Sequence, residues 1–173
     1  MIFLFLSGCL DDQVGVETDS EFVAFQSDFA DYSSWPSWQV ADDPVGTTHL
    51  TGPRWVFIDP EPPAGATEFP LGTVIVKEAR NGNPEDWDIF GMVKRGAGYN
   101  AQGAHGWEWF ELSLAAGEPA ILWRGELPPS EAGYECVLAD GSIAESGDCN
   151  GCHAGSWMND YVQDAALQLE AVQ

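Results

Sequence analysis

Short runs of β-branched and aromatic residues, broken by Gly, Pro and Asn, fill the middle of the chain. These runs cover residues 54–58, 72–77, 89–94, 107–112 and 120–123. Because they recur at a regular spacing with no helical pattern between them, they predict the strands of an antiparallel sheet. The stretches 60–70 and 96–106, rich in Gly and Pro or in Gly alone, are expected to be loops.

Helical periodicity is confined to the two sides of this β region. Before it, four aromatic residues share one helical face, with Asp19 and Ser20 as caps and Pro36 as the end: Phe22, Phe25, Phe29 and Tyr32. After it, four residues of the segment 157–172 share a face: Trp157, Tyr161, Ala165 and Leu169. The sequence therefore predicts an α+β fold, mainly an antiparallel β-sheet with an N-terminal and a C-terminal helix.

A C-x-x-C-H motif lies just ahead of the predicted C-terminal helix, at Cys149-Asn150-Gly151-Cys152-His153. The motif is typical of c-type haem attachment, since its two thiols are spaced to reach the two vinyl groups of the porphyrin. A tight turn that enters a helix brings both sulfurs to one porphyrin edge and carries the His153 imidazole beneath the iron. The expected cofactor is a covalently attached haem c, with Cys149 and Cys152 as attachment points and His153 as iron ligand.

Three other interpretations of these residues stay open and rank below haem. Cys149 and Cys152 would form a redox dithiol, but that motif belongs near a βαβ pattern, which the sequence lacks. Cys136, Cys149, Cys152 and His153 have the right chemistry for a structural zinc site, although the adjacent Cys152 and His153 would have difficulty turning toward one ion. A disulfide within the motif would close a very short, strained loop.

The chain is strongly acidic, with 28 Asp and Glu residues against six Lys and Arg and a formal net charge of −22. A nucleic-acid binder needs the opposite charge, so that class is excluded. The acidic surface either keeps the protein soluble through self-repulsion or steers it toward a basic redox partner, and composition does not choose between them. With 45% hydrophobic residues, the 173 residues suffice for one domain with a sizeable core.

The N-terminus predicts a lipid anchor. An apolar run over residues 1–6 is followed by Leu6-Ser7-Gly8-Cys9, which resembles the lipobox of bacterial lipoproteins, in which the cysteine is lipid-modified. The run is too short to span a bilayer and lacks a basic n-region, so we expect the natural start upstream. Residues 1–9 are then a signal, residues 10–18 an acidic tether and residues 19–173 the haem domain. We expect a periplasmic or cell-surface protein, lipid-anchored to a bacterial membrane through Cys9, which leaves Cys136 without a role.

Five blocks, in this order, carry a family resemblance: residues 54–60, 69–78, 92–94, 106–110, and 149–153 with 160–162. Their order resembles the cytochrome P-460 family over most of the chain from the first helix onward. The specific part is the block Gly-Thr-Val-Ile-Val-Lys-Glu at residues 72–78, placed ahead of a late C-x-x-C-H motif.

The resemblance implies a mostly antiparallel β fold with flanking helices, usually dimeric, that holds one five-coordinate c-haem. It implies that Lys77 is cross-linked to the porphyrin rim, that Arg54 lies on the open side of the haem, and that hydroxylamine is oxidised toward nitrous oxide or nitric oxide. A sister group of the same fold, the cytochromes c′-β, binds nitric oxide without the cross-link or turnover. From the residues alone, Lys77 either contacts the haem or snorkels to the surface, and Arg54 either binds a propionate or ligand or forms a surface ion pair.

Phe90 departs from the family pattern. The hydroxylamine oxidisers carry a carboxylate on the open side, in the strand aligned with residues 89–94, and Phe90 stands at that position. Hydroxylamine oxidation removes protons and wants a base, which phenylalanine cannot supply. An apolar wall instead favours neutral diatomic ligands. Glu78, Asp88 or Glu108 would substitute if the alignment shifts by a residue or two.

We therefore expect a c-type cytochrome with an open axial haem site that either oxidises hydroxylamine or binds nitric oxide. The third interpretation is a six-coordinate electron carrier. Met158 follows His153 too closely to reach the opposite side of the haem, so Met92, His49 or His105 would be the sixth ligand.

Overall fold

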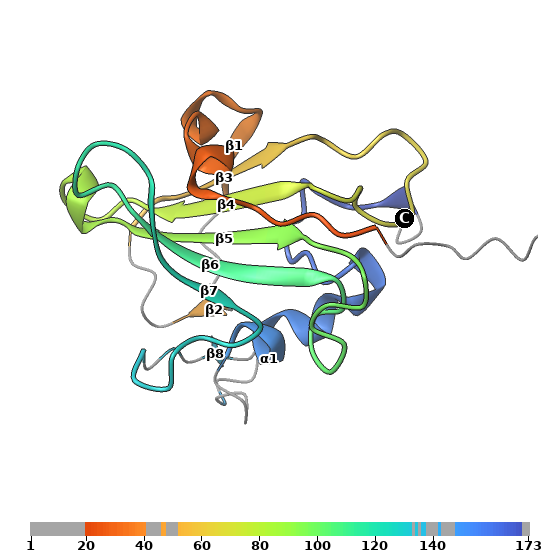
Figure 1. Cartoon of the computed structure of the whole chain (residues 1–173). Helices are drawn as coiled ribbons and strands as arrows, with labels where there is room; N and C mark the ends of the chain where they lie inside the picture. The colour runs from red at the N-terminus through yellow and green to blue at the C-terminus, as the bar shows by residue number, and fades with distance from the viewer. Residues whose placement is uncertain are drawn as a thin grey trace, which may run out of the picture.

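The computed structural model describes residues 20–40, 46–47, 52–132, 134, 136–137, 142 and 148–170. Six strands form one antiparallel sheet in the spatial order β1-β3-β4-β5-β6-β7 (Figure 1). Their bounds are Ser37–Val40 (β1), Arg54–Asp59 (β3), Val74–Ala79 (β4), Asp88–Lys94 (β5), Trp107–Ser113 (β6) and Ala120–Gly125 (β7). A separate two-stranded sheet pairs β2 (Gly46–Thr47) with β8 (Cys136–Val137).

All five strands predicted from the sequence are present as β3 to β7, with ends that differ by one or two residues. The strand β1 was not predicted, because it is short. It has only four residues, begins directly after Pro36 and lies at the edge of the sheet, where it pairs with β3 alone. The fold is therefore mostly β with some helix, and the antiparallel sheet is confirmed.

The predicted N-terminal helix is replaced by two short 3-10 helices, η1 (Gln26–Phe29) and η2 (Tyr32–Ser34). Residues 20–25 are not helical: Phe25 has extended backbone and its amide donates to Asp28 Oδ2 at 2.6 Å, so η1 begins only at Gln26. Phe29 and Tyr32 are buried, whereas Phe25 is 65% exposed. The aromatic stripe therefore reflects contacts with the sheet rather than one continuous helix.

The predicted C-terminal helix is wrong in extent. The chain forms the α-helix α1 (Cys149–His153) and the 3-10 helix η4 (Ala154–Asn159), and helical structure then stops until the last described residues. Asp160 and Tyr161 both adopt left-handed backbone, with φ of 50° and 66°. Trp157 is 65% exposed, so it does not begin a buried helical face. One further 3-10 helix, η3 (Pro84–Asp86), precedes β5.

The sheet is packed on both faces, because alternate residues of each strand point to opposite sides. One face, which we call the N-terminal face, is covered by residues 22–35 and centres on Phe29, Tyr32, Phe57 and Phe110. The other, which we call the α1 face, is covered by α1 and residues 161–169. Figure 1 shows the N-terminal segment along one side of the strands and α1 with the C-terminal segment on the other.

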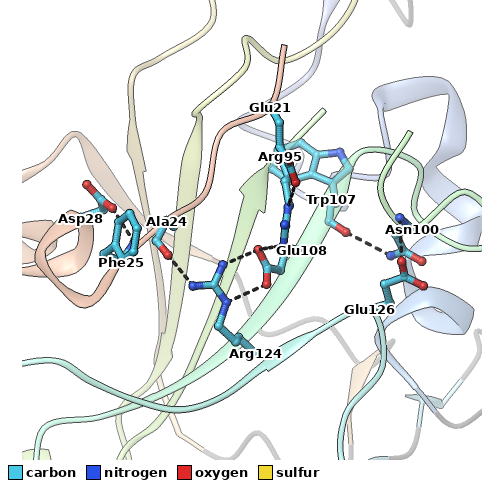
Figure 2. Close-up of polar contacts among 10 residues, drawn as sticks. All are labelled: Glu21, Ala24, Phe25, Asp28, Arg95, Asn100, Trp107, Glu108, Arg124 and Glu126. Carbon is cyan, nitrogen blue, oxygen red and sulfur yellow. Dashed lines mark hydrogen bonds and ion pairs between the residues drawn. The ribbon is translucent and has the colours of Figure 1, made fainter. Parts of the chain in front are cut away.

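An acidic residue at the centre of the N-terminal face fixes the N-terminal segment. Figure 2 shows Glu108 between the guanidinium groups of Arg95 and Arg124. Arg95 also pairs with Glu21 at 2.6 Å, and Arg124 donates to the carbonyl of Ala24. These contacts join residues 21–24 to β6 and β7.

Within the part of the chain that the structure describes, no helix is long and apolar enough to cross a membrane. The predicted signal with Cys9 and the predicted acidic tether fall on residues 1–18, which lie outside the described residues, as does His49.

Candidate functional site

The first half of the C-x-x-C-H motif fixes α1 to its surroundings. Asp148 caps the helix, since its Oδ1 accepts from the amide of Gly151 at 2.8 Å. The side chain of Asn150 makes five hydrogen bonds to the loop 100–104, to β6 and to the carbonyl of Glu126. A Cβ atom on Gly103 would lie 2.3 Å from the Asn150 side chain, so glycine is needed at that position. The motif is thus docked on the α1 face of the sheet.

His153 is held in a defined orientation. Its Nδ1 lies 2.6 Å from the carbonyl oxygen of Tyr161, and its ring packs on the Trp109 ring at a centroid distance of 4.6 Å. A carbonyl oxygen only accepts hydrogen bonds, so Nδ1 carries the proton. Among the described residues no hydrogen bond engages Nε2. The imidazole therefore presents a nitrogen lone pair at Nε2, which is the form that binds a metal.

The environment keeps His153 neutral near pH 7. Burial is the main cause and lowers its pKa to about 4. The hydrogen bond with Tyr161 acts in the opposite direction, and the positive charge of Lys77 lowers the pKa further. The influence of Lys77 also shows that the structure brings these two predicted site residues into the same region.

The turn after η4 places the Tyr161 carbonyl. Asp160 and Tyr161 are consecutive left-handed residues that are not glycine, a combination that is uncommon and strained. Asn159 stabilises the turn, because its side chain donates to the carbonyls of Val162 and Leu167 and accepts from the amide of Leu169. In the sequence, Tyr161 lies on a predicted helical face and residues 160–162 belong to the family resemblance, but neither pattern predicted this turn or its contact with His153.

The two cysteines of the motif differ in state. Cys149 is a free thiol, and burial, the largest cause, raises its pKa to about 12. Cys152 is disulfide-bonded, and since Cys149 is free, the bridge does not lie within the motif. The motif therefore contains neither the two free thiols of a redox dithiol nor a disulfide between Cys149 and Cys152. In the described parts of the chain no group of three or more His, Cys, Asp and Glu side chains is placed to hold a metal ion.

A row of six side chains crosses the α1 face, one from each strand of the sheet. The register pairs them in the order Trp38, Val56, Lys77, Phe90, Glu111 and Trp123. Lys77 and Phe90, both predicted as site residues, are thus directly opposite each other on neighbouring strands. Arg54 alternates with Val56 and Ile58 in β3, so its side chain lies on the α1 face, two residues along the strand from the Val56 position in this row. Arg54 is buried.

Glu111 and Tyr134 were not predicted, and they extend this site. The Tyr134 hydroxyl donates to Glu111 Oε2 at 2.5 Å and accepts from Trp123 Nε1 at 3.1 Å. The Tyr134 ring meets Phe90 edge to face at 5.3 Å. Burial is the main reason that the pKa of Tyr134 is raised, and the bond to Glu111 adds to it, so the hydroxyl keeps its proton.

A β-bulge makes this arrangement possible. Between Glu111 and Leu112 the pairing with β7 skips one residue, so Leu122 has no partner. The extra residue lets Ile121 pack on the N-terminal face while Trp123 points to the α1 face. The Glu111 carboxylate, on the neighbouring strand, therefore lies beside Phe90. The spacing of these residues in the sequence does not reveal this pairing.

Three carboxylates were named as possible bases in place of Phe90. Two of them lie on the N-terminal face of the sheet, opposite the α1 face to which Phe90 points. Glu78 accepts from Tyr32 and pairs with Arg80, and Glu108 pairs with Arg95 and Arg124, so both belong to the N-terminal face. Asp88 is on the α1 face, two residues before Phe90 in β5.

The proposed sixth ligands differ in setting. Met92 is buried in the core of the α1 face, paired with Trp109. His105 is exposed in the loop that precedes β6, and Met158 is 60% exposed.

No family model, no curated protein and no solved structure matches the chain.

Proposed function

We propose that the protein is a c-type haem protein of the cytochrome P-460 type, with haem joined to Cys149 and Cys152 and iron bound by His153. The single observation that carries the proposal is the His153 geometry inside the C-x-x-C-H motif. Its Nδ1 is committed to the Tyr161 carbonyl at 2.6 Å, and metal-binding histidines are typically oriented by such a bond at the other nitrogen.

The residues fit a c-type haem with one condition. Cys149 is a thiol, as thioether formation requires, and Lys77 lies close enough to act on His153. The Cys152 sulfur is disulfide-bonded, so it accepts a vinyl group only after a dithiol reductant has opened that bridge. When bound, the haem supplies a redox-active iron that coordinates small nitrogen oxides.

The side chains beside Lys77 favour binding of nitric oxide. Phe90 faces the α1 side, and its ring contacts the ring of Tyr134, while Trp123 lies next to Tyr134. Aromatic surface excludes water and anions and tolerates a small neutral ligand. Nitric-oxide binding of the cytochrome c′-β kind is therefore the function we favour.

Glu111 supports hydroxylamine oxidation as a second candidate. The carboxylate lies directly opposite Phe90 in the register and accepts a short hydrogen bond from Tyr134. A carboxylate within the site is the kind of group that takes protons from a substrate that is being oxidised.

The acidic surface and N-terminal motif extend the proposal to partners and location. A net charge of −22 favours a basic protein as redox partner. Lipidation of Cys9 would anchor the protein on the periplasmic or cell-surface side of a bacterial membrane. A homodimer is proposed from the family resemblance alone.

Export with a haem-attachment system and a dithiol reductant is expected to yield coloured protein. Its intact mass should contain one haem, its spectrum should be five-coordinate, and the ferrous form should bind nitric oxide. A red-shifted, broadened Soret band that disappears in Lys77→Ala would report a lysine cross-link. If the haem is five-coordinate, His105→Ala, a change at an exposed histidine, should leave the spectrum unchanged, whereas His153→Ala should lose the native spectrum.

A colourless product from the same preparation would contradict the haem assignment. A six-coordinate, low-spin spectrum would favour the electron carrier instead, and Met92→Leu would then test the buried methionine as the sixth ligand.

Hydroxylamine turnover with an artificial electron acceptor decides between the two haem functions. If the protein is an oxidase, Glu111→Gln is expected to lower the turnover rate by about 10²-fold or more, the usual contribution of a general base. Glu118→Gln, an exposed carboxylate in the turn between β6 and β7, is the matched control. Absence of turnover and of iron reduction in the parent protein would leave nitric-oxide binding as the function.

A further inference from the structure

A buried ion pair lies beneath the turn that follows η4. Lys94 Nζ and Asp160 Oδ1 are 2.6 Å apart, and both side chains are almost fully buried. Asp160 Oδ1 also accepts from Trp107 Nε1 at 3.3 Å, and Oδ2 accepts from the amide of Phe69 at 3.0 Å. The carboxylate is therefore anchored to three separate segments: the end of β5, the start of β6 and the loop before β4.

Stability alone does not explain this pair. Removing two charges from water costs free energy that their mutual attraction often fails to recover, so a buried pair adds little net stability. The same residue, Asp160, has left-handed backbone, as has Tyr161 after it. Left-handed backbone is unfavourable for a residue that carries a Cβ atom, less so for aspartate than for tyrosine. Strain of this kind persists only where surrounding contacts determine the backbone, and it is concentrated at functional sites.

The strained turn contacts the C-x-x-C-H motif through the carbonyl of Tyr161. The Tyr161 carbonyl, next in the chain to Asp160, accepts from His153 Nδ1 at 2.6 Å. We propose that Asp160, anchored by Lys94, is a positioning residue that aims this carbonyl at His153 and so fixes the tautomer in which Nε2 is free to bind a ligand. The identity of that ligand as haem iron rests on the proposed function, whereas the tautomer is a property of the chain itself.

Nitrogen-15 NMR of the His153 ring in the full chain without haem tests the proposal. The parent protein should show the proton on Nδ1. In Asp160→Asn the carbonyl is no longer fixed, and we expect the ratio of the Nδ1–H to the Nε2–H tautomer to fall about tenfold, the equivalent of one lost hydrogen bond. The matched control is Asp164→Asn, which makes the same change four residues later, where the carboxylate bonds to Trp38 and Ala166 rather than to this turn.

A merely structural role for Asp160 would lower the melting temperature and leave the tautomer ratio unchanged, and that result would overturn the proposal. If Asp160→Asn does not fold, the double variant Lys94→Met with Asp160→Asn, which buries no unpaired charge, carries the same test. In haem-loaded protein, the iron–histidine stretching frequency should shift in the Asp160 variant and not in Asp164→Asn. A parent that takes up no haem but shows the expected tautomers would refute the proposed function and leave this inference intact.

Discussion

Replacing Asn150 with alanine is expected to lower the free energy of unfolding by about 3 kcal/mol, because several buried polar groups lose their partners. The side-chain oxygen accepts from Asn100 Nδ2 at 2.8 Å, Trp109 Nε1 at 2.9 Å and the Ala104 amide at 3.0 Å. The side-chain nitrogen donates to Asn100 Oδ1 at 3.1 Å and to the Glu126 carbonyl at 3.0 Å. Alanine satisfies none of them.

The effect should reach the C-x-x-C-H motif, because α1 has only five residues. A helix this short has no stability of its own and depends on tertiary contacts. Asn150 bonds α1 to the loop 100–104, to Trp109 of β6 and to the Glu126 carbonyl, and it lies between the two cysteines in sequence. We therefore expect Asn150→Ala to reduce the yield of haem-loaded protein as well as its stability.

Urea unfolding and thermal melting measure the change. A loss of about 3 kcal/mol corresponds to a fall of about 6–12 °C in melting temperature for a chain of this size. Asn83→Ala, at an exposed asparagine that makes no side-chain cap bond to η3, should change stability by less than about 0.5 kcal/mol. Equal melting temperatures for the two variants would mean that water replaces the Asn150 contacts.

The sheet could be predicted from the sequence because its signals are local. Each strand from β3 to β7 is a short β-branched or aromatic run between turn residues, and pairing with neighbours only confirms what the run indicates. The helices could not, because Phe22, Phe25, Phe29 and Tyr32 match a helical period by spacing while their burial is set by the sheet. Aromatic residues at such spacing pack equally well from two separate turns.

Local sequence predicted the candidate site only at the C-x-x-C-H motif. Cys149, Cys152 and His153 lie within one five-residue motif. Lys77 was predicted from the family resemblance, and strand alternation only placed it on the same face of its strand as Ile75. Glu111 and Tyr134 come from distant segments, and their position beside Phe90 depends on the register of β5 with β6 and on the bulge at Leu122. The contacts of Asp160 depend on the left-handed turn, which interrupts the predicted helix. Phe90 shows the difference clearly: it departs from the pattern of the family that the sequence resembles, where a carboxylate is expected, and the fold places the carboxylate of Glu111 opposite it.

Replacing Glu108 with glutamine is the second change expected to have a large effect, at about 2–3 kcal/mol of unfolding free energy. The carboxylate is 2% exposed and accepts from Arg124 Nε and Nη2, each at 2.7 Å, and from Arg95 Nη1 at 3.2 Å. Glutamine keeps one acceptor oxygen but carries no charge, so Arg124 loses its ion pair with Glu108 while Arg95 keeps its pair with Glu21 (Figure 2). The loss stays below that of a fully buried pair, since Arg95 and Arg124 remain 21% and 30% exposed.

The loss should also release the N-terminal segment, because the two arginines that Glu108 orients are the ones that bond to Glu21 and to the Ala24 carbonyl. Amide exchange of Phe22, which donates to the Arg95 carbonyl at 2.9 Å, should accelerate in Glu108→Gln. Glu21→Gln removes only the exposed end of the network and should cost less than about 1 kcal/mol. If the two variants lose equal stability, the buried carboxylate does not organise this face and the segment is held by the packing of Phe29 and Tyr32 alone.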